Sequence, residues 1–192
     1  MRSDPKNTKT FKTEAAFEKW MRTHHARETE VWLRIYKKSS GVATITPAQA
    51  LDVALCWGWI DAIRNALDEQ SFLQRYTPRR PKSVWSQINR DHVARLTKAG
   101  KMTPQGQKQI DAAKADGRWE AAYEGQRTAQ VPPDLRRELD GNPTAAEFFA
   151  SLDSANRYAI VYRLDEAKRP ETRERRLKKF VAMLARGEKI HG

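Results

Sequence analysis

Strand-like patterns are confined to residues 31–77 of this chain, and helix-like patterns occupy most of the remainder. In residues 31–36, apolar side chains at alternate positions form one face of a strand. The runs 59–66 and 71–77 are joined by Leu67-Asp68-Glu69-Gln70, which predicts a hairpin of two short strands. We therefore expect an α+β fold: a small antiparallel sheet packed with helices, followed by an all-helical C-terminal part.

Helix-start signals locate the helices. The clearest is Thr46-Pro47-Ala48-Gln49, because it combines a capping threonine, a proline at the first helical position and a glutamine three residues after the cap. Thr13 is the expected cap of an earlier helix, and Ser83 is the expected cap of a later one. The later helix should have an inward face made of Val84, Trp85, Ile88, His92, Val93 and Leu96, and further helices are expected at 104–115, 134–140, 144–152, 154 onward and 170–186.

The stretch 117–131 follows Asp116 and predicts a linker. A boundary near residue 120 divides the chain into an α+β domain at 1–120 and a helical C-terminal region at 121–192. A chain of 192 residues buries enough surface to fold without a disulfide or a metal. The single cysteine, Cys56, lies in the apolar run Ala54-Leu55-Cys56-Trp57, which predicts a buried thiol in a reducing compartment.

The N-terminal residues, Met1 to Lys12, are polar and lack the apolar segment of a signal peptide. No part of the sequence approaches the roughly 20 consecutive apolar residues that a membrane-spanning helix needs. We therefore expect a cytoplasmic protein without a membrane span.

The net charge is +12, and it is concentrated in three basic stretches, residues 1–40, 71–101 and 167–192, which alternate with neutral or acidic ones. Such a potential attracts nucleic acid and acidic partners. In the last basic stretch Glu171 and Glu174 interrupt the charged face, which favours an ordinary solvated helix over a nucleic-acid-binding one.

Common catalytic signatures are absent from the sequence: there is no Walker loop, dinucleotide-binding glycine fingerprint, nucleophile elbow or His-Glu-x-x-His helix. The four histidines and one cysteine are too dispersed to predict a metal site, so no metal, no cofactor and no catalytic residue is assigned. His92 lies on an apolar stripe and suits acid–base chemistry if a partner lies nearby. A packing role is the favoured interpretation.

The richest combination of functional side chains lies between Trp57 and Asn89. Arginine offers planar paired donors that match a carboxylate or phosphate, and a helix start at Ser83 adds free backbone N–H groups. This segment predicts a pocket for an anionic ligand. In the alternative interpretation the tryptophans fill the core, Asp61 pairs with an arginine and the other charges are solvated. The candidate ligand-binding residues are Trp59, Asp61, Arg75, Arg79, Arg80, Ser83, Trp85, Ser86 and Asn89.

Several strings of unusual composition run along the chain. They are Glu30-Val31-Trp32-Leu33, Leu55-Cys56-Trp57-Gly58-Trp59-Ile60-Asp61, Arg75-Tyr76-Thr77-Pro78-Arg79-Arg80, Gly100-Lys101-Met102 and Ala167-Lys168-Arg169. In these strings, and over nearly its full length, the chain resembles the YdeI/OmpD-associated family, described as bacteriocin-protection proteins. Its front part is also distantly similar to YdhG-like domains. The resemblance implies a cytoplasmic protein tied to envelope stress and bacteriocin tolerance, and it supplies no established catalytic residues.

Three hypotheses about function follow. The leading one is a non-enzymatic binding or stress-protection protein that takes an anionic small molecule or an acidic protein partner. The second is a nucleic-acid-binding protein that uses its basic surface. The third is an unrecognised enzyme in which Asp61 or His92 acts on a substrate held by arginine. The sequence does not indicate an oligomeric state.

Overall fold

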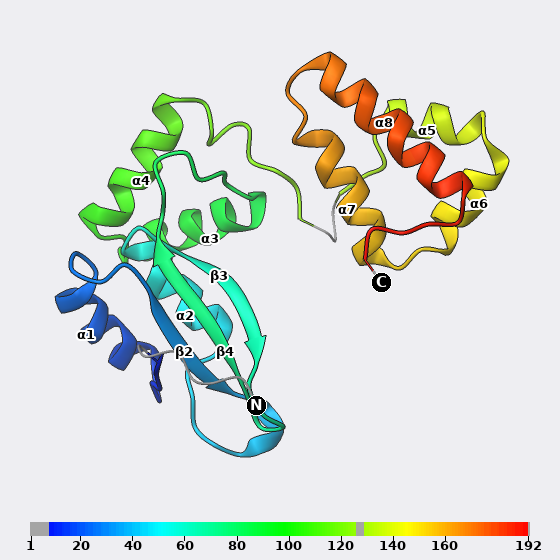
Figure 1. The fold of residues 1–192 in the computed structure, drawn as a ribbon. Helices are drawn as coiled ribbons and strands as arrows, with labels where there is room; N and C mark the ends of the chain where they lie inside the picture. Colours follow the sequence, from blue (N-terminus) through cyan, green and yellow to red (C-terminus); the bar gives the residue numbers. More distant parts are fainter. Residues whose placement is uncertain (1–7, 126–128, 192) are drawn as a thin grey trace. The chain divides into compact units, whose positions relative to one another are not determined.

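The computed structural model describes residues 8–125 and 129–191, which form two compact units, Met1–Ala122 and Tyr123–Gly192 (Figure 1). We call them the front unit and the helical unit. Residues 1–7 of the polar N-terminal stretch, and residues 126–128 of the expected linker, lie outside the described residues. Each unit has a hydrophobic core of its own.

The front unit contains a four-stranded sheet in the order β1-β2-β4-β3. Strand β4 runs antiparallel to both β2 and β3, and β1 runs parallel to β2. The predicted α+β class is confirmed, but the sheet is mixed and not purely antiparallel. The difference comes from β1, which is two residues long and therefore too short to show a periodic pattern in the sequence. The strands are β1 (Thr8–Lys9), β2 (Val31–Tyr36), β3 (Trp59–Ala66) and β4 (Ser71–Pro78).

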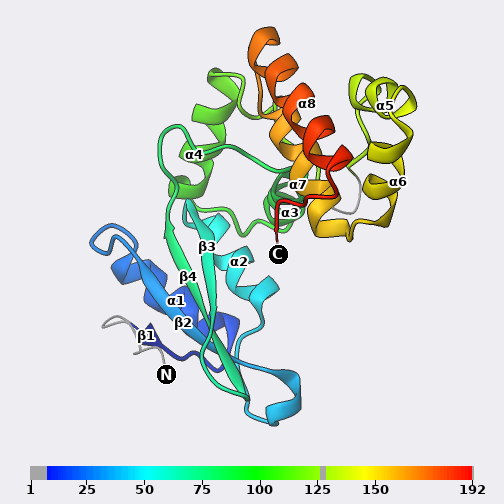
Figure 2. The ribbon, with the colours of Figure 1, turned by 45° about the vertical axis from the view of Figure 1, so that its right-hand side comes forward.

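Helices α1 (Glu14–His24) and α2 (Pro47–Cys56) cover one face of this sheet (Figures 1 and 2). Thr13 caps α1, and the predicted capping box of α2 is formed in both directions between Thr46 and Gln49. The shared core consists of apolar side chains from both layers. It includes Phe17, Trp20, Met21, Val31, Leu33, Ile35, Ile45, Val53, Trp59 and Tyr76.

Helices α3 (Gln87–Lys98) and α4 (Pro104–Ala115) pack with α2 around a second cluster of buried residues. The predicted cap at Ser83 is wrong, because Ser86 caps α3 and its Oγ accepts a hydrogen bond from the backbone N–H of Asn89 (3.2 Å). Val84 therefore lies in the loop before the helix. Val84 and Ile88 were expected to face inward, yet they are 57% and 50% exposed.

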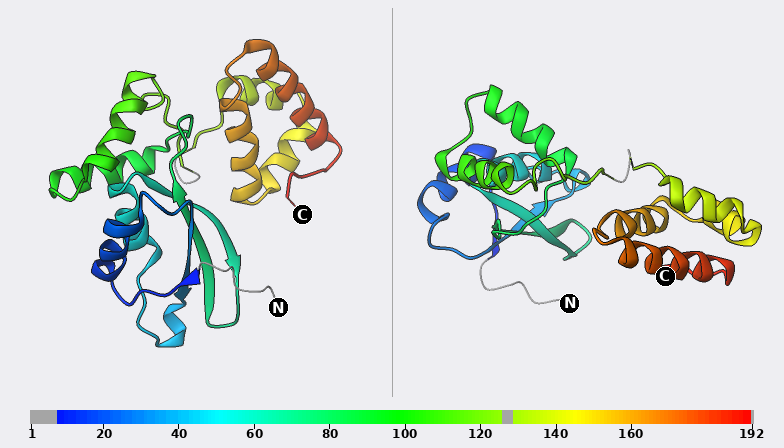
Figure 3. Two further views of the ribbon diagram at one scale, coloured as in Figure 1. Left: turned by 60° about the vertical axis from the view of Figure 1, so that its left-hand side comes forward. Right: turned by 90° about the horizontal axis from the view of Figure 1, so that it is seen from above.

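The described residues of the helical unit form four helices, drawn in yellow-green to red in Figure 3. They enclose a core that includes Leu135, Phe149, Ile160, Leu177 and Phe180. They are α5 (Pro133–Asp140), α6 (Pro143–Ser151), α7 (Ser154–Asp165) and α8 (Pro170–Ala185). Within residues 8–125 and 129–191, none of the helices combines the length and apolar character needed to cross a bilayer.

The chain after α8 folds back onto the start of α7 (Figure 1). The buried side chain of Asn156 holds it there, because the Oδ1 atom accepts a hydrogen bond from the backbone N–H of His191 (2.8 Å). The Nδ2 atom of Asn156 also donates to the carbonyl oxygen of His191 (3.3 Å). This contact fixes the C-terminal segment against the bundle.

Candidate functional site

Arg79, at the end of β4, is the central residue of the predicted anion site. It is 6% exposed, and its guanidinium carbon lies 3.6 Å from the centre of a Trp85 ring. The Nη1 atom donates hydrogen bonds to Ser83 Oγ (3.3 Å) and to the carbonyl oxygen of Val84 (3.2 Å). These contacts fix the plane of the guanidinium group.

A second tryptophan extends this arrangement. Trp119 meets Trp85 edge to face, with ring centres 4.9 Å apart, and the cationic groups of Arg90 and Lys114 lie 5.2 and 5.5 Å from the Trp119 ring centre. Arg118 Nη1 donates to the carbonyl oxygen of Ser83 (2.8 Å). Three cations thus lie against the two indole rings, and Arg118 forms an ion pair with Asp116 (2.8 Å) beside them. We call this set the Arg–Trp cluster: Arg79, Trp85, Arg90, Lys114, Arg118 and Trp119.

Four of the six residues of this cluster, Arg90, Lys114, Arg118 and Trp119, were not predicted from the sequence. Arg118 and Trp119 fall in the stretch assigned to a linker, but both belong to the front unit, where Trp119 packs on the second cluster of buried residues and Arg118 bonds to Ser83. A tryptophan next to an arginine in a supposed linker was a usable signal, because large aromatic side chains are seldom left in solvent.

The first turn of α3 adds a positive potential next to the loop 79–86. Ser86 is 7% exposed and caps this turn, which the structure describes in full and which contains no acidic residue. A helix N-terminus carries about half a positive charge and favours anions. Arg80 and Lys82 are exposed in the same loop, and neither forms an ion pair with any residue in the described ranges.

Three of the predicted residues, Trp59, Arg75 and Asp61, do not belong to this site. Trp59 is 1% exposed and belongs to the core between the sheet and helices α1 and α2. Arg75 forms an ion pair with Glu30, with 2.7 Å between Arg75 Nε and Glu30 Oε2. On the neighbouring strand β2 the residue opposite Arg75 is Trp32, so the two side chains share one face of the sheet. Trp32 lies on the face opposite Val31, which packs in the core, so Arg75 projects away from that core.

Asp61 is opposite Tyr76 on the neighbouring strand and therefore lies on the core side of the sheet. Asp61 and Arg75 are thus on opposite faces and do not converge. Partial desolvation raises the pKa of Asp61, and the positive charges of Arg64 and Arg79 offset only part of that rise.

His92 has a hydrogen-bond partner, which acid–base chemistry would require and which the sequence did not identify. Its Nδ1 atom lies 2.7 Å from Asp52 Oδ1, and Arg95 Nη2 donates to both oxygens of the same carboxylate at 2.7 Å. A carboxylate can only accept here, so this contact places a proton on Nδ1 of the histidine. Sequence reasoning did not find Asp52, because the pair joins helices α2 and α3 across 40 positions.

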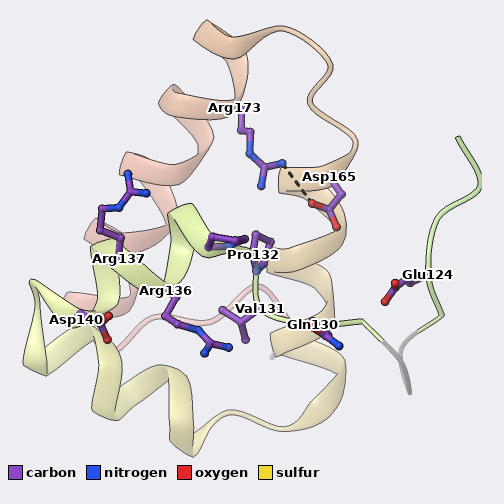
Figure 4. Close-up of a pocket in the computed structure, with 10 residues that line it drawn as sticks. Glu124, Gln130, Val131, Pro132, Arg136, Arg137, Asp140, Asp165 and Arg173 are labelled. Atoms are coloured by element: carbon purple, nitrogen blue, oxygen red, sulfur yellow. Dashed lines mark hydrogen bonds and ion pairs between the residues drawn. The ribbon is translucent and has the colours of Figure 1, made fainter.

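The helical unit has an open cavity of about 880 Å³ beside α5 (Figure 4). Its Arg173 is already fully engaged: Nε and Nη2 donate to Asp134 at 2.6 and 3.0 Å, and Nη1 donates to the carbonyl oxygen of Leu164. Arg136 and Arg137 extend in different directions in Figure 4. The cavity therefore does not direct several cations at one ligand group.

Comparison with known families gives two matches. Residues 9–109 match a family described as "Domain of unknown function (DUF8412)", and residues 128–187 match one described as "Bacteriocin-protection, YdeI or OmpD-Associated". No curated protein and no solved structure matches the chain. The front match is to an uncharacterised domain, so the similarity to YdhG-like domains stays a prediction.

Proposed function

The chain belongs to the DUF8412 family and carries a YdeI/OmpD-associated domain, and from that premise we propose that its front unit is a binding module for an anionic ligand. The ligand is a carboxylate- or phosphate-bearing small molecule, or an acidic surface of a protein partner. The site consists of the Arg–Trp cluster, the first turn of α3, and the exposed side chains of Arg80 and Lys82. In this proposal the protein acts in the cytoplasm by binding and not by catalysis. That binding is its contribution to the bacteriocin protection named in the family description.

The observation that carries this proposal is the fixed guanidinium of Arg79 beside a helix N-terminus without acidic residues. Arg79 is held by an indole ring and by the loop, so its orientation is set before a ligand arrives. Arg80 and Lys82 supply mobile charges on the same loop, which add attraction at little structural cost. Trp59, Arg75 and Asp61 are left out of the site, because the first is core and the other two lie on opposite sheet faces.

The test replaces the two exposed cations, Arg80 and Lys82, and leaves the packed residues of the Arg–Trp cluster unchanged. All six tryptophans lie at or before residue 119, so tryptophan fluorescence reports unfolding of the front unit alone. Inorganic phosphate, citrate and an acidic peptide are expected to raise the unfolding temperature of the wild-type front unit. In a variant with Arg80→Glu and Lys82→Glu the rise should disappear.

The matched control changes Arg136→Glu and Arg137→Glu, which are two adjacent exposed cations of the helical unit. This control has the same net charge as the test variant, and it should keep the full ligand-induced rise. An equal rise in the wild type and in the Arg80/Lys82 variant would reject the site.

A second candidate function is binding of single-stranded nucleic acid. It is favoured by Trp119, which is partly exposed and has Arg90 and Lys114 beside its ring. Aromatic side chains stack on bases and neighbouring cations bind phosphates. The salt dependence of affinity separates this function from small-anion binding, because each phosphate contact adds to the slope of log affinity against log salt.

A further inference from the structure

Two exposed aliphatic side chains flank the start of α3. Val84, in the loop before the helix, is 57% exposed, and Ile88, in the first turn, is 50% exposed. In the part of the chain that the structure describes, only two other large apolar side chains are similarly exposed, Val42 and Ile63. Because Val84 and Ile88 are four positions apart, their Cα atoms lie within about 14 Å of each other. The two side chains can therefore contact one surface together.

The same loop carries two cations. Arg80 and Lys82 are exposed, and neither forms an ion pair with a described residue. They belong to the basic stretch 71–101, in which the single acidic residue is Asp91. The surface at the start of α3 thus combines exposed aliphatic groups with positive charge that no neighbouring carboxylate neutralises.

Buried side chains hold this loop to the body of the front unit. Trp85 is 2% exposed and packs on Arg79, and Arg79 Nη1 donates to the carbonyl oxygen of Val84 (3.2 Å). Arg118 Nη1 donates to the carbonyl oxygen of Ser83 (2.8 Å). Both bonds end on main-chain atoms, so the exposed side chains of the loop take no part in them. Figure 1 shows the loop between β4 and α3 extending past the end of the sheet.

This combination of side chains matches the chemistry of an anionic lipid surface. Such a surface has phosphate groups directly above a hydrocarbon layer, so it accepts cations and aliphatic side chains at the same time. The carboxylates of a solvated acidic protein would match Arg80 and Lys82 but would leave Val84 and Ile88 in water. The exposed aliphatic pair therefore favours a lipid surface over an acidic protein.

We infer that segment 80–88 binds the surface of an anionic phospholipid bilayer. Arg80 and Lys82 contact headgroup phosphates, and Val84 and Ile88 enter the outermost part of the acyl layer. The inference rests on the proposed anion site and names its ligand as the phosphate of a lipid headgroup. The attachment is peripheral and reversible, because only two aliphatic side chains and two cations contribute to it.

The test measures cosedimentation of the full chain with vesicles made of equal parts of phosphatidylglycerol and phosphatidylcholine. The wild type should bind these vesicles and should not bind vesicles of phosphatidylcholine alone. Val84→Ser with Ile88→Ser should lower the partition coefficient at least about tenfold, because each methyl or methylene group kept out of the hydrocarbon lowers it about fourfold. Since both side chains are exposed, this variant should fold normally.

Val42→Ser with Ile63→Ser is the matched control. It removes one valine and one isoleucine, 46% and 55% exposed, from other segments of the same unit, and it should bind vesicles like the wild type. Equal vesicle binding by the wild type and the Val84/Ile88 variant would overturn the inference, because the contact would then be purely electrostatic.

Soluble anions separate failure of this inference from failure of the anion site. The Val84/Ile88 variant keeps Arg80 and Lys82, so phosphate and citrate should still raise its unfolding temperature. A wild-type protein that shows this rise and does not sediment with the anionic vesicles overturns the lipid assignment alone. A wild-type protein that shows neither response rejects the anion site as well.

Discussion

Replacing Gly106 by alanine tests how closely helix α4 packs against helix α2. A Cβ atom at this position would lie 2.5 Å from Met102 Sδ and 2.8 Å from the carbonyl oxygen of Leu55, and nearer still to the carbonyl oxygen of Cys56. The methionine side chain can move aside. The two carbonyl oxygens belong to the last turn of α2 and cannot, so α4 must shift outward.

The expected magnitude follows from three terms. Alanine in place of glycine inside a helix stabilises by about 1 kcal/mol. Overpacking against a rigid wall costs about 3 kcal/mol. The outward shift also weakens the hydrogen bond from Thr103 Oγ1 to the carbonyl oxygen of Cys56, which contributes about 1 kcal/mol. We expect Gly106→Ala to lower the free energy of unfolding of the front unit by about 3 kcal/mol.

Urea unfolding followed by tryptophan fluorescence measures this change in the front unit alone. A control separates the clash from the other effects of alanine. Gly100→Ala enters open space at a φ of +68° and should cost about 1 kcal/mol through backbone strain alone. A Gly106→Ala protein as stable as the wild type would refute the packing argument.

Three further predictions concern single groups. Because its pKa is raised to about 11, Cys56 should react with iodoacetamide at pH 8 only after unfolding, and rapid labelling of the native protein would contradict this. Arg173 lowers the pKa of Asp134, so the ion pair between them stabilises the folded helical unit above about pH 4. This stabilisation is lost as the pH falls through the folded-state pKa of Asp134. Hydrogen exchange of α5 and α8 amides should therefore be faster in Asp134→Asn by a factor that shrinks towards pH 3. Asn156→Ala removes both contacts to His191 and should destabilise the helical unit by about 2 kcal/mol, with faster exchange in α7; unchanged exchange would show that the tail contributes nothing.

Local signals in the sequence predicted most of the fold. The capping box at Thr46 and the alternation in 31–36 depend on neighbours within a few residues, and both elements form as expected. The start of α3 was misplaced because two serines precede it. Tertiary contacts decide between them, since Trp85 is buried against Arg79 in the loop and only Ser86 is left to cap the helix.

The candidate site was harder to predict, because its members meet through long-range contacts. The opposite orientations of Asp61 and Arg75 depend on the register of the hairpin, which contains an irregularity between Asp61 and Arg64. A bulge of this kind changes which side chains share a face, and no residue in the run marks its position. The contact between Trp85 and Trp119 likewise joins segments 34 positions apart.

The basic stretches 71–101 and 167–192 look equivalent in the sequence, but the structure distinguishes them. On α8 several cations are bound to nearby acceptors, such as Lys178 to Glu174 (2.7 Å) and Arg173 to Asp134. In the front unit Arg79, Arg90 and Lys114 lie against two indole rings. Arg80 and Lys82 are exposed in the neighbouring loop and form no ion pair within the described residues. If the protein binds single-stranded DNA, the front unit should therefore provide the phosphate contacts.

Titrations of fluorescent single-stranded DNA at several salt concentrations test this assignment. Each phosphate contact contributes about −0.7 to the slope of log affinity against log salt. Arg80→Ala with Lys82→Ala should therefore make the slope less steep by about 1.4, since two contacts are lost. Arg175→Ala with Lys179→Ala removes the same charge from α8 and should leave the slope unchanged. The opposite pattern would assign binding to α8, because only residues that contact phosphate release counterions when the complex forms.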